Sequence, residues 1–287
     1  MSNTITPRQN RTTVSDRKCS PNIWGDFPWR DIQDPRSRID GIVRRHDFSD
    51  FPLQGTLTTQ ISNGQFKVFG DTGNTMTRVV SINSVLVPGG ALQLALDTDN
   101  DEIAFADAYP SFLLTGLKTN GAQKLAFEIC YAQNSVATNM ASVFFGLANV
   151  AGVTLSTTVP LNDADAISNT MYGVGFRIEE DGLGVVDTVV TDGATSFSNI
   201  GDTEGGTMTA YTFAKYGMLY DPNNTSRCIR FFVNNVECAT AISATTLQGY
   251  TNLDANGLGF LFAATADSAG TSFNSYIKWL QMGQVIL

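Results

Sequence analysis

The sequence predicts an all-β protein built from antiparallel sheets. It combines 26 Gly with 43% hydrophobic and only 16% charged residues, a composition suited to an apolar core crossed by short strands and many turns. From about residue 53 onward, short apolar or alternating segments recur, and no amphipathic stretch of about 12 residues separates them. Parallel strands would need such helical connections, so we expect antiparallel sheets stacked as a sandwich.

Eleven segments carry the strand pattern, separated by turn signals rich in Gly, Asp, Asn and Pro. The strands are expected at Arg78–Val87, Leu92–Asp97, Lys124–Gln133, Val143–Ala148, Tyr172–Glu179, Val185–Val190, Thr209–Leu219, Ile229–Val233, Val236–Ala241, Leu258–Ala264 and Ser275–Leu287. The turn signals are Pro88-Gly89-Gly90, Asp181-Gly182, Asp192-Gly193, Gly205-Gly206 and Asp221-Pro222-Asn223-Asn224. Short helices are expected at Asp163–Asn169 and Thr245–Gln248. Strands such as Val143–Phe145 are apolar on both faces, which predicts that a loop or another subunit covers the outer face.

One hairpin can be predicted in detail. Asn234-Asn235 lies between two strand segments, and Asn tolerates a positive φ, so a two-residue turn is expected. Val233 then faces Val236, Phe231 faces Cys238, and Cys228 faces Ala241. This register separates Cys228 from Cys238 too far for a bridge. The four cysteines, which include Cys19 and Cys130, are therefore expected to be buried thiols rather than disulfides.

Residues 1–52 differ from the rest and are interpreted as an extended arm before a sandwich domain at 53–287. Five of the nine prolines lie in this segment, and no periodic pattern surrounds the tryptophans Trp24 and Trp29. Such a segment is either a disordered tail or an arm that lies along a neighbour. Aromatic and arginine residues are typical interface anchors, which favours the arm. The anchors predicted to bind a partner are Trp24, Phe27, Trp29, Arg30, Arg36, Arg38, Arg44 and Arg45.

Charge divides the chain at nearly the same place. Residues 1–45 carry a net charge of +4, whereas the remaining residues carry −13. An acidic body is a poor binder of nucleic acids or anionic membranes, and the aspartates between the arm's arginines argue against nucleic acid there. An acidic protein surface is the expected partner of the arm. Without a membrane-length apolar run or a signal-peptide core, we expect synthesis in a host cytoplasm without export.

The C-terminal half resembles the concanavalin-A-like lectin and glucanase superfamily, which includes laminin-G-like modules. The resemblance is carried by Met218–Asp221, by Arg230-Phe231-Phe232-Val233-Asn234-Asn235-Val236, and by Ser275–Leu280. Asn235 stands where that superfamily usually has Gly. The resemblance extends over roughly residues 55–287 and implies a two-sheet jelly-roll sandwich. In particular, the sequence is similar to jelly-roll proteins of tailed phages thought to sit on virions.

Enzymes of this superfamily use carboxylates spaced E-x-D-x-E or E-x-D-x-x-E on one strand. Glu179-Glu180-Asp181 begins such a motif, but Gly182 follows and no second glutamate completes it. Glu128 stands alone. The only histidine, His46, lies in the arm and is expected to be exposed or at an interface. No catalytic residues and no cofactor are therefore predicted, and the expected class is not an enzyme.

A metal site is also not predicted. Asp97-Thr98-Asp99-Asn100-Asp101-Glu102 resembles the start of a calcium loop, but its sixth residue is Glu102 where that loop needs Gly. We interpret it as a solvated loop, with a loose calcium site as the alternative.

Three classes of function follow. The first is a structural virion protein, a capsid decoration protein that binds the major capsid protein or another virion protein and forms a homo-oligomer. The second is a carbohydrate-binding protein on a tail or fibre, for which Tyr109, Tyr250 and Trp279 are candidate sugar-contacting aromatics. The third, least favoured, is a glycoside hydrolase.

Overall fold

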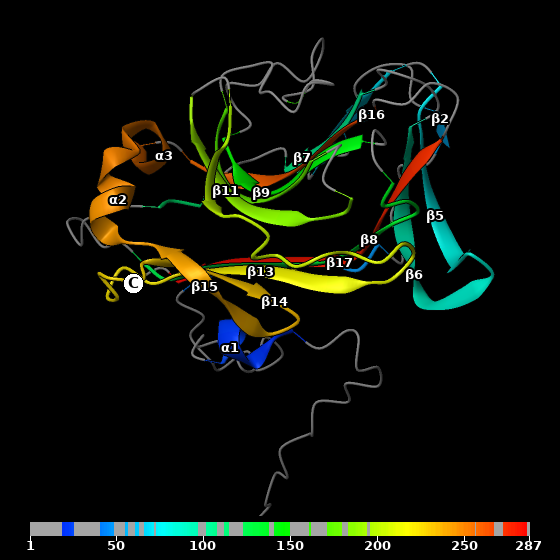
Figure 1. Cartoon of the computed structure of the whole chain (residues 1–287). Helices are drawn as coiled ribbons and strands as arrows, with labels where there is room; N and C mark the ends of the chain where they lie inside the picture. The colour runs from blue at the N-terminus through cyan, green and yellow to red at the C-terminus, as the bar shows by residue number, and fades with distance from the viewer. Residues whose placement is uncertain are drawn as a thin grey trace, which may run out of the picture.

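The computed structural model describes most of the chain from residue 41 onward and a short segment before it. The described residues are 19–25, 41–48, 55–56, 61–62, 66–71, 73–96, 102–107, 112–114, 123–137, 141–149, 161, 171–179, 183–193, 196–255, 257–266 and 272–285. Within them the strands form two antiparallel sheets that face each other, with helix α1 below one sheet and helices α2 and α3 at one end (Figure 1).

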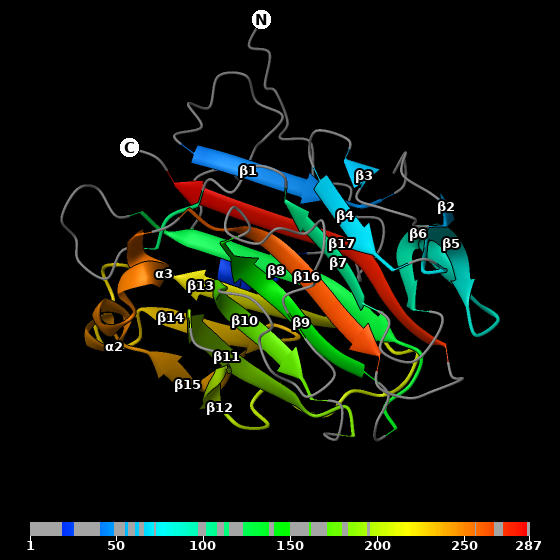
Figure 2. The same ribbon diagram turned by 90° about the horizontal axis from the view of Figure 1, so that it is seen from above.

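Nine of the described strands form the first sheet, sheet A. Its order is β15-β14-β13-β8-β17-β6-β5-β2, and β1 pairs with the C-terminal half of β17. The bounds are β1 Gly41–His46, β2 Gly55–Thr56, β5 Thr75–Ile82, β6 Val85–Leu96, β8 Leu125–Gln133, β13 Ala214–Tyr220, β14 Ile229–Val233, β15 Val236–Ile242 and β17 Phe273–Val285. Figure 2 shows β1 running beside β17 at one margin of the sandwich.

Eight described strands form the second sheet, sheet B, in the order β12-β11-β10-β9-β16-β7-β4-β3. The bounds are β3 Ile61–Ser62, β4 Phe66–Gly70, β7 Glu102–Asp107, β9 Ala141–Ala148, β10 Tyr172–Ile178, β11 Val186–Asp192, β12 Ser198–Gly201 and β16 Gly259–Ala266. The helices are short: α1 Pro21–Trp24, α2 Ala244–Gly249 and α3 Thr251–Ala255. The expected all-β, antiparallel, two-sheet architecture is confirmed.

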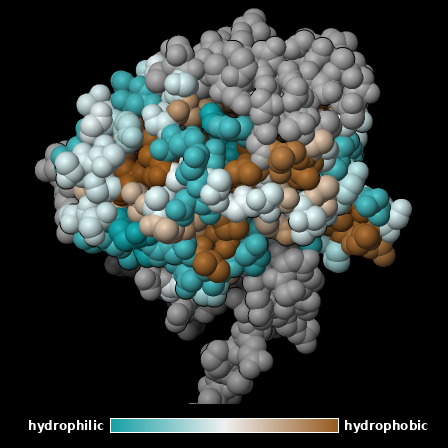
Figure 3. Space-filling model, viewed as in Figure 1, coloured by the Kyte–Doolittle hydropathy of each residue, from teal (hydrophilic) through white to brown (hydrophobic). Residues whose placement is uncertain are grey.

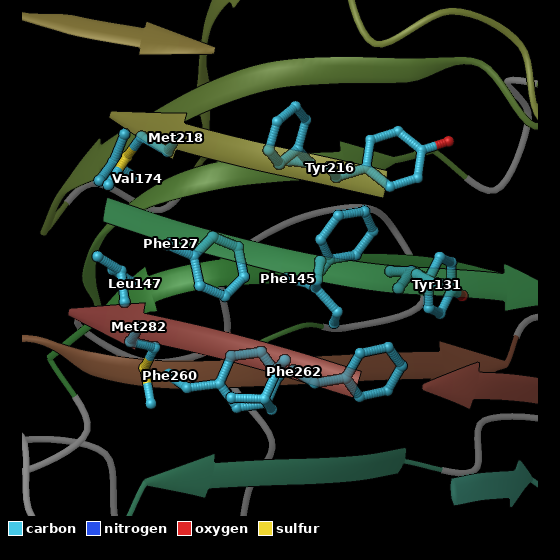
Figure 4. Close-up of a cluster of buried hydrophobic side chains, with 14 of the residues drawn as sticks. Phe127, Tyr131, Phe145, Leu147, Val174, Tyr216, Met218, Phe260, Phe262 and Met282 are labelled. Atoms are coloured by element: carbon cyan, nitrogen blue, oxygen red, sulfur yellow. The ribbon is translucent and has the colours of Figure 1, made fainter. Parts of the chain in front are cut away.

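The core lies between the sheets and is rich in aromatic rings. Phe145 of β9 packs on Phe176 of β10 and on Tyr216 of β13, with ring centroids 5.6 and 5.2 Å apart. Phe127 and Phe260 stack across the two sheets at 5.9 Å (Figure 4). Because the rings interdigitate from both sheets, this layer contributes much of the apolar burial that stabilises the fold.

The outer faces of both sheets are also covered, as the two-sided apolar strands predicted. On sheet B, a second buried cluster joins Phe144, Val189 and Leu261 to Leu161, Met171 and Phe197 from the connecting segments. On sheet A, Ile23 and Trp24 of α1 cover Ala126, Leu219 and Phe232. In both places residues of the chain itself provide cover.

Two central strands of sheet B approach closely where two glycines face each other. Gly146 of β9 is paired with Gly175 of β10. A Cβ built on Gly175 would lie 2.4 Å from Phe145 O and 2.7 Å from Gly146 Cα. The local backbone contact therefore requires both residues to lack a side chain.

Most predicted strands lie where expected, but the segment 78–97 differs. Its first half is a hairpin, because the chain turns at Asn83 and Ser84, both with positive φ. Pro88-Gly89-Gly90, predicted as a turn, instead lies inside β6. There the register shifts opposite Val79–Ser81, so the glycines with φ 81° and 76° form a bulge rather than a chain reversal.

The Asn234-Asn235 turn is confirmed, with positive φ at both residues and Val233 opposite Val236. The predicted register of the two strands beyond this turn is wrong. A bulge between Arg230 and Phe232 places Arg230, not Cys228, opposite Ala241. No disulfide forms: all four cysteines are thiols, three of them buried and Cys19 half-buried. The helix at Thr245–Gln248 is confirmed as α2, whereas Asp163–Asn169 lies outside the described residues.

Candidate functional site

The most specific polar site in the described residues is the place where the N-terminal segment 19–25 docks on the outer face of sheet A. We call it the arm-docking site and define it by Glu128, Gln281, Asn235 and Gly217, which receive Cys19–Gly25. Glu128 lies in β8 and is fully buried. The Ser20 backbone N–H donates to both of its carboxylate oxygens, at 3.2 and 3.0 Å. The Trp24 Nε1–H donates to one of them at 2.8 Å.

Further contacts fix both ends of the segment. The Cys19 thiol donates to Gln281 Oε1 at 2.8 Å. The Asn22 N–H donates to Asn235 Oδ1 at 2.9 Å, and Asn22 Nδ2 donates to Asn235 O at 2.7 Å. Ile23 fits over Gly217, where a Cβ would lie 2.2 Å from Ile23 Cδ1. The site thus recognises the segment through backbone, side-chain and shape contacts together.

The local sequence explains why this segment forms one helical turn. Pro21 occupies the first helical position, where its fixed φ is favourable and its missing N–H is not needed. The Gly25 N–H donates to Pro21 O at 2.7 Å and closes the turn. The turn places Ile23 and Trp24 on one side, facing the sheet.

Burial dominates the electrostatics of the arm-docking site. Removal of Glu128 from water raises the pKa of its carboxyl, while the hydrogen bonds from Ser20 and Trp24 and the nearby Lys215 act in the opposite direction. Burial likewise raises the pKa of the Cys19 thiol to about 11, and the charge of Glu128 adds to the effect. Neither group is set up as a catalytic base or nucleophile, because the site is closed by the chain's own segment.

The structure places three of the eight predicted anchors on the sandwich itself. Trp24 is buried at the arm-docking site. Arg44 forms an ion pair with Asp107 of β7 and lies 5.7 Å from the Phe112 ring. Arg45 is exposed on β1. The interpretation of residues 1–52 as an arm that lies along a neighbour is therefore wrong for 19–25 and 41–48, which contact their own sandwich. Phe27, Trp29, Arg30, Arg36 and Arg38 lie outside the described residues.

His46 is half-buried, contrary to the expectation of an exposed side chain. It ends β1, opposite Leu280, and its ring meets the Phe66 ring edge-on with centroids 4.4 Å apart. Burial and then the positive charge of Arg44 lower its pKa to about 4. The physical reason for the error is that β1 pairs with β17, which carries the histidine onto the sandwich.

The two carboxylate candidates lie on different sheets. Glu128 is covered on sheet A, whereas Glu179 follows β10 of sheet B and forms an ion pair with Arg177.

Arg177 also lies 3.9 Å from Asp187 of β11 and 5.5 Å from the Phe197 ring. Asp187 in turn accepts the Thr203 N–H at 2.8 Å. Arg177 thus lies against the carboxylates of Glu179 and Asp187 and links β10 to β11. This arrangement does not leave an acid and a nucleophile facing a substrate. Glu180 and Asp181 lie outside the described residues.

The calcium-like run can be placed only at its end. Residues 97–101 lie outside the described residues, and the Glu102 N–H donates to Asp71 Oδ2 at 2.9 Å. Within the described part of the chain, no group of three or more His, Cys, Asp or Glu residues could hold a metal ion. In the same residues, no helix is long and apolar enough to cross a membrane.

The candidate sugar-contacting aromatics do not form a platform. Trp279 is buried and Tyr250 packs against the core, while Tyr109 lies outside the described residues. The exposed aromatic found instead is Tyr211, which is 39% exposed and has a φ of 61°. Sequence reasoning missed it because it placed Tyr211 inside the expected strand Thr209–Leu219, whereas β13 begins only at Ala214.

No protein-family model matches the sequence, and comparison with curated proteins finds no match. Solved structures, in contrast, share the fold. Peanut lectin matches with a TM-score of 0.53 over 86% of this chain and 98% of its own, at 12% identity. The chain has the concanavalin-A-like jelly-roll fold. A basic lectin of winged bean, solved with Tn-antigen, matches with a TM-score of 0.50 over 85% and 98% of the two chains, at 10% identity.

Enzymes share this jelly-roll as well. An endo-acting O-glycanase of the human gut microbiota, which initiates mucin breakdown, matches with a TM-score of 0.50 over 85% and 98% of the chains, at 9% identity. Lectins and hydrolases therefore use the same sandwich, and at these identities the likeness concerns the fold alone. The fold resemblance inferred from the hairpin and the last strand is confirmed.

Proposed function

We propose that this protein is a non-enzymatic structural protein of a tailed-phage virion, which decorates the capsid and is attached by its N-terminal segment. The observation that carries the proposal is the charge division, +4 in residues 1–45 against −13 in the rest. A basic, aromatic segment suits an acidic protein shell, and an acidic body suits the outer, solvated surface of a particle.

The arm-docking site supports a refined version of this proposal. Segment 19–25 is fixed to sheet A, so its anchors Trp24 and Ile23 are already used within the chain. The contacts to the virion are then assigned to Phe27, Trp29, Arg30, Arg36 and Arg38. In this view the residues between segment 19–25 and β1 are held at both ends on sheet A, which makes that sheet the side nearest the capsid.

The test is binding of the purified full-length chain to particles that lack it. Replacing Arg30, Arg36 and Arg38 together by Gln should lower the number of copies bound, and raised salt should weaken binding of the unaltered chain. Lys67→Gln, on the sandwich, is the matched control and should bind normally. Unchanged binding of the triple variant would contradict the proposal, as would a few copies confined to the tail instead of hundreds over the head.

A second candidate is carbohydrate binding, favoured by the jelly-roll lectins that share this fold and by exposed Tyr211. This ring lies near Tyr276, whose pKa is raised by burial and secondarily by Tyr211. Exposed tyrosines offer both an apolar face and a hydroxyl to a sugar. A glycan array probed with the full chain and with Tyr211→Ala tests it: binding lost in the variant supports this candidate, and no binding by either chain excludes it for the glycans on the array.

A further inference from the structure

The charge of the sandwich is divided between its two sheets. Residues 46–287 contain 22 Asp and Glu but only nine Lys and Arg. In the described strands of sheet B, four acidic residues stand against two basic ones. The described strands of sheet A show the reverse, with six basic residues against two acidic ones, Glu128 and Glu237. The acidic character of the chain therefore lies mostly outside the strands of sheet A.

Lys215 of β13 and Arg230 of β14 project from the outer face of sheet A. Each precedes a residue whose side chain lies in the core between the sheets, and side chains alternate along a strand. Beside Arg230, the partly exposed Arg227 binds the same carboxylate, that of Glu237. Arg227 Nη2 lies 2.8 Å from one oxygen of Glu237, and Arg230 Nη1 lies 3.3 Å from the other. One negative charge between two positive charges leaves this end of the outer face positive.

Arg45 extends the positive charge to the other side of segment 19–25. It is exposed on β1, opposite Gln281, which accepts the Cys19 thiol. Burial and the charge of Glu128 raise the pKa of Cys19, and the charges of Arg45 and Lys215 act against them, so both cations lie near the docked segment. Because β13, β8 and β17 are consecutive in the sheet and β1 pairs with β17, the two cations flank the segment. We call Arg45, Lys215, Arg227 and Arg230 the basic face.

Apolar side chains contribute little to the basic face. Among the large apolar side chains exposed in the described residues, Val80, Val85 and Leu86 lie at the tip of the β5–β6 hairpin, the brown protrusion at the right of Figure 3. That hairpin is at the opposite margin of sheet A from β14 and β15 (Figure 1). Val236 is exposed next to the docked segment, beside Asn235, which binds Asn22. A contact made through the basic face is therefore governed by charge.

From these observations we propose that the basic face seats the sandwich on an acidic protein surface, with segment 19–25 at the centre of the contact. The inference rests on the proposed attachment through the arm and extends that contact to the body of the protein. Arg30, Arg36 and Arg38 follow segment 19–25 in the sequence, so the arm adds its charges to a surface that is already positive. Arginine side chains bind carboxylates in a bidentate geometry, which suits three of the four residues of the face.

The charge pattern favours a protein partner over nucleic acid. Glu237 stands within the basic face, and acidic residues predominate in the rest of the sandwich. A nucleic acid is uniformly negative and long, so it would be repelled by Glu237 and by the acidic surfaces beyond the face. The separate carboxylates of a protein surface can lie opposite the cations and leave a neutral group opposite Glu237.

Immobilised poly-L-glutamate is a probe of the basic face that requires no virion. At low salt the full chain should bind it despite a net charge of −9, and added salt should weaken the binding. Arg45→Gln combined with Lys215→Gln should weaken binding at least tenfold. Lys67→Gln combined with Arg78→Gln removes the same charge outside the basic face and should change binding less than twofold. Hydrogen exchange of residues 19–25 shows that the segment stays docked in both variants.

Glu237→Gln changes the basic face in the opposite direction. It removes the exposed acid between Arg227 and Arg230, so binding to poly-L-glutamate should become at least threefold tighter. Glu179→Gln, which removes an acid paired with an arginine next to sheet B, is the matched control and should leave binding unchanged. Since Glu237 makes no contact with segment 19–25 among the interactions described, release of that segment would not account for the gain.

Equal effects of the two double variants, or of Glu237→Gln and Glu179→Gln, would overturn the proposal. So would duplex DNA that displaces the chain from the beads at a lower charge concentration than soluble poly-L-glutamate does, since the face would then belong to a nucleic-acid site. On particles, carbodiimide coupling should join Lys215, and not Lys67, to carboxylates of the shell. Particle binding without coupling at Lys215 would overturn the basic face and leave attachment by the arm. Binding to poly-L-glutamate through the face without any binding to particles would support the face and contradict the capsid attachment.

Discussion

Replacement of Glu128 by Leu should release the N-terminal segment from sheet A while leaving the jelly-roll folded. Glu128 supplies the acceptors for the Ser20 N–H and the Trp24 Nε1–H, and it is completely buried. Leu has a similar size but no acceptor, so both donors would be left unsatisfied if the segment stayed docked. The core between the sheets does not include Glu128, because its side chain lies on the outer face.

The size of the effect follows from those two donors. A buried donor left without a partner costs about 1–3 kcal/mol, so two cost roughly 2–6 kcal/mol. Apolar contacts of Leu with Ile23 offset part of this, which places the expectation near the lower end. At about 1.4 kcal/mol per factor of ten, docking should weaken by roughly 30-fold or more.

Glu128→Gln separates the charge from the hydrogen bonds. One oxygen of Glu128 accepts from both Ser20 and Trp24, so a Gln oxygen in that position keeps both contacts. Since burial raises the pKa of Glu128 in the docked state, docking favours the protonated carboxyl. Its contribution is therefore fully present below the undocked pKa and is lost as the pH rises through the docked pKa. The docking free energy of the unaltered chain minus that of Glu128→Gln should fall across this window and be level on either side.

Hydrogen exchange of the peptide containing residues 19–25 measures docking directly, and chemical denaturation of the whole chain measures the sandwich. Glu237→Gln, which removes an exposed partner of Arg227 and Arg230, is a control that should not alter exchange in residues 19–25. The reasoning is refuted if Glu128→Leu leaves the protection of this peptide unchanged, or if the peptide loses protection only when the entire sandwich unfolds.

Three further predictions concern the sandwich. Gly175→Ala should destabilise the sandwich by about 1–3 kcal/mol in denaturation experiments, because the new Cβ would meet Phe145 O and Gly146. Gly249→Ala, where nothing lies within 4 Å of the new Cβ, should be neutral or slightly stabilising. Equal effects of the two substitutions would contradict the close-approach argument. Because the pKa of His46 falls from 6.5 to about 4 on folding, its contribution to stability is present above pH 6.5 and is lost as the pH falls toward about 4. The free energy of unfolding of His46→Phe should therefore fall less between pH 6.5 and pH 4 than that of the unaltered chain. Parallel pH dependences of the two chains would contradict this prediction. Burial raises the pKa of Cys19 and Cys238 to about 11, so a thiol reagent at pH 8 should react about a hundredfold slower with both than with an unfolded chain, and rapid native labelling would disprove their burial.

The fold could be predicted from the sequence because its strongest signals are local. Strand alternation, the Asn234-Asn235 turn and the absence of amphipathic helices each restrict the chain over a few residues, and together they specify antiparallel sheets. The errors occur where one local signal has two structural outcomes. Pro88-Gly89-Gly90 satisfies a turn and a bulge equally well, and only the pairing of β6 with β5 decides between them.

The candidate site could not be predicted in the same way. Glu128 is a single acid in an apolar strand, and its partners Ser20 and Trp24 lie more than 100 residues away in the sequence. Aromatic residues in a proline-rich segment indicate that something binds them, but not whether the surface belongs to the same chain. Trp24 was therefore recognised as an anchor, while the surface that it anchors to required the structure.

Asn235 connects the hairpin to the arm in a way that neither pattern reveals alone. Where the superfamily usually has Gly, this chain has Asn with a φ of 70°, a conformation that Gly adopts at lower cost. Asn235 makes two contacts with Asn22: its side-chain Oδ1 accepts the Asn22 N–H, and its backbone carbonyl accepts from Asn22 Nδ2. A glycine at this position would keep the backbone contact but lose the side-chain contact. Asn22 lies in the same helical turn that Glu128 holds through Ser20 and Trp24. The departure from the usual turn residue thus coincides with the place where the hairpin contacts the N-terminal segment, which makes the turn part of the arm-docking site and not only a link between two strands.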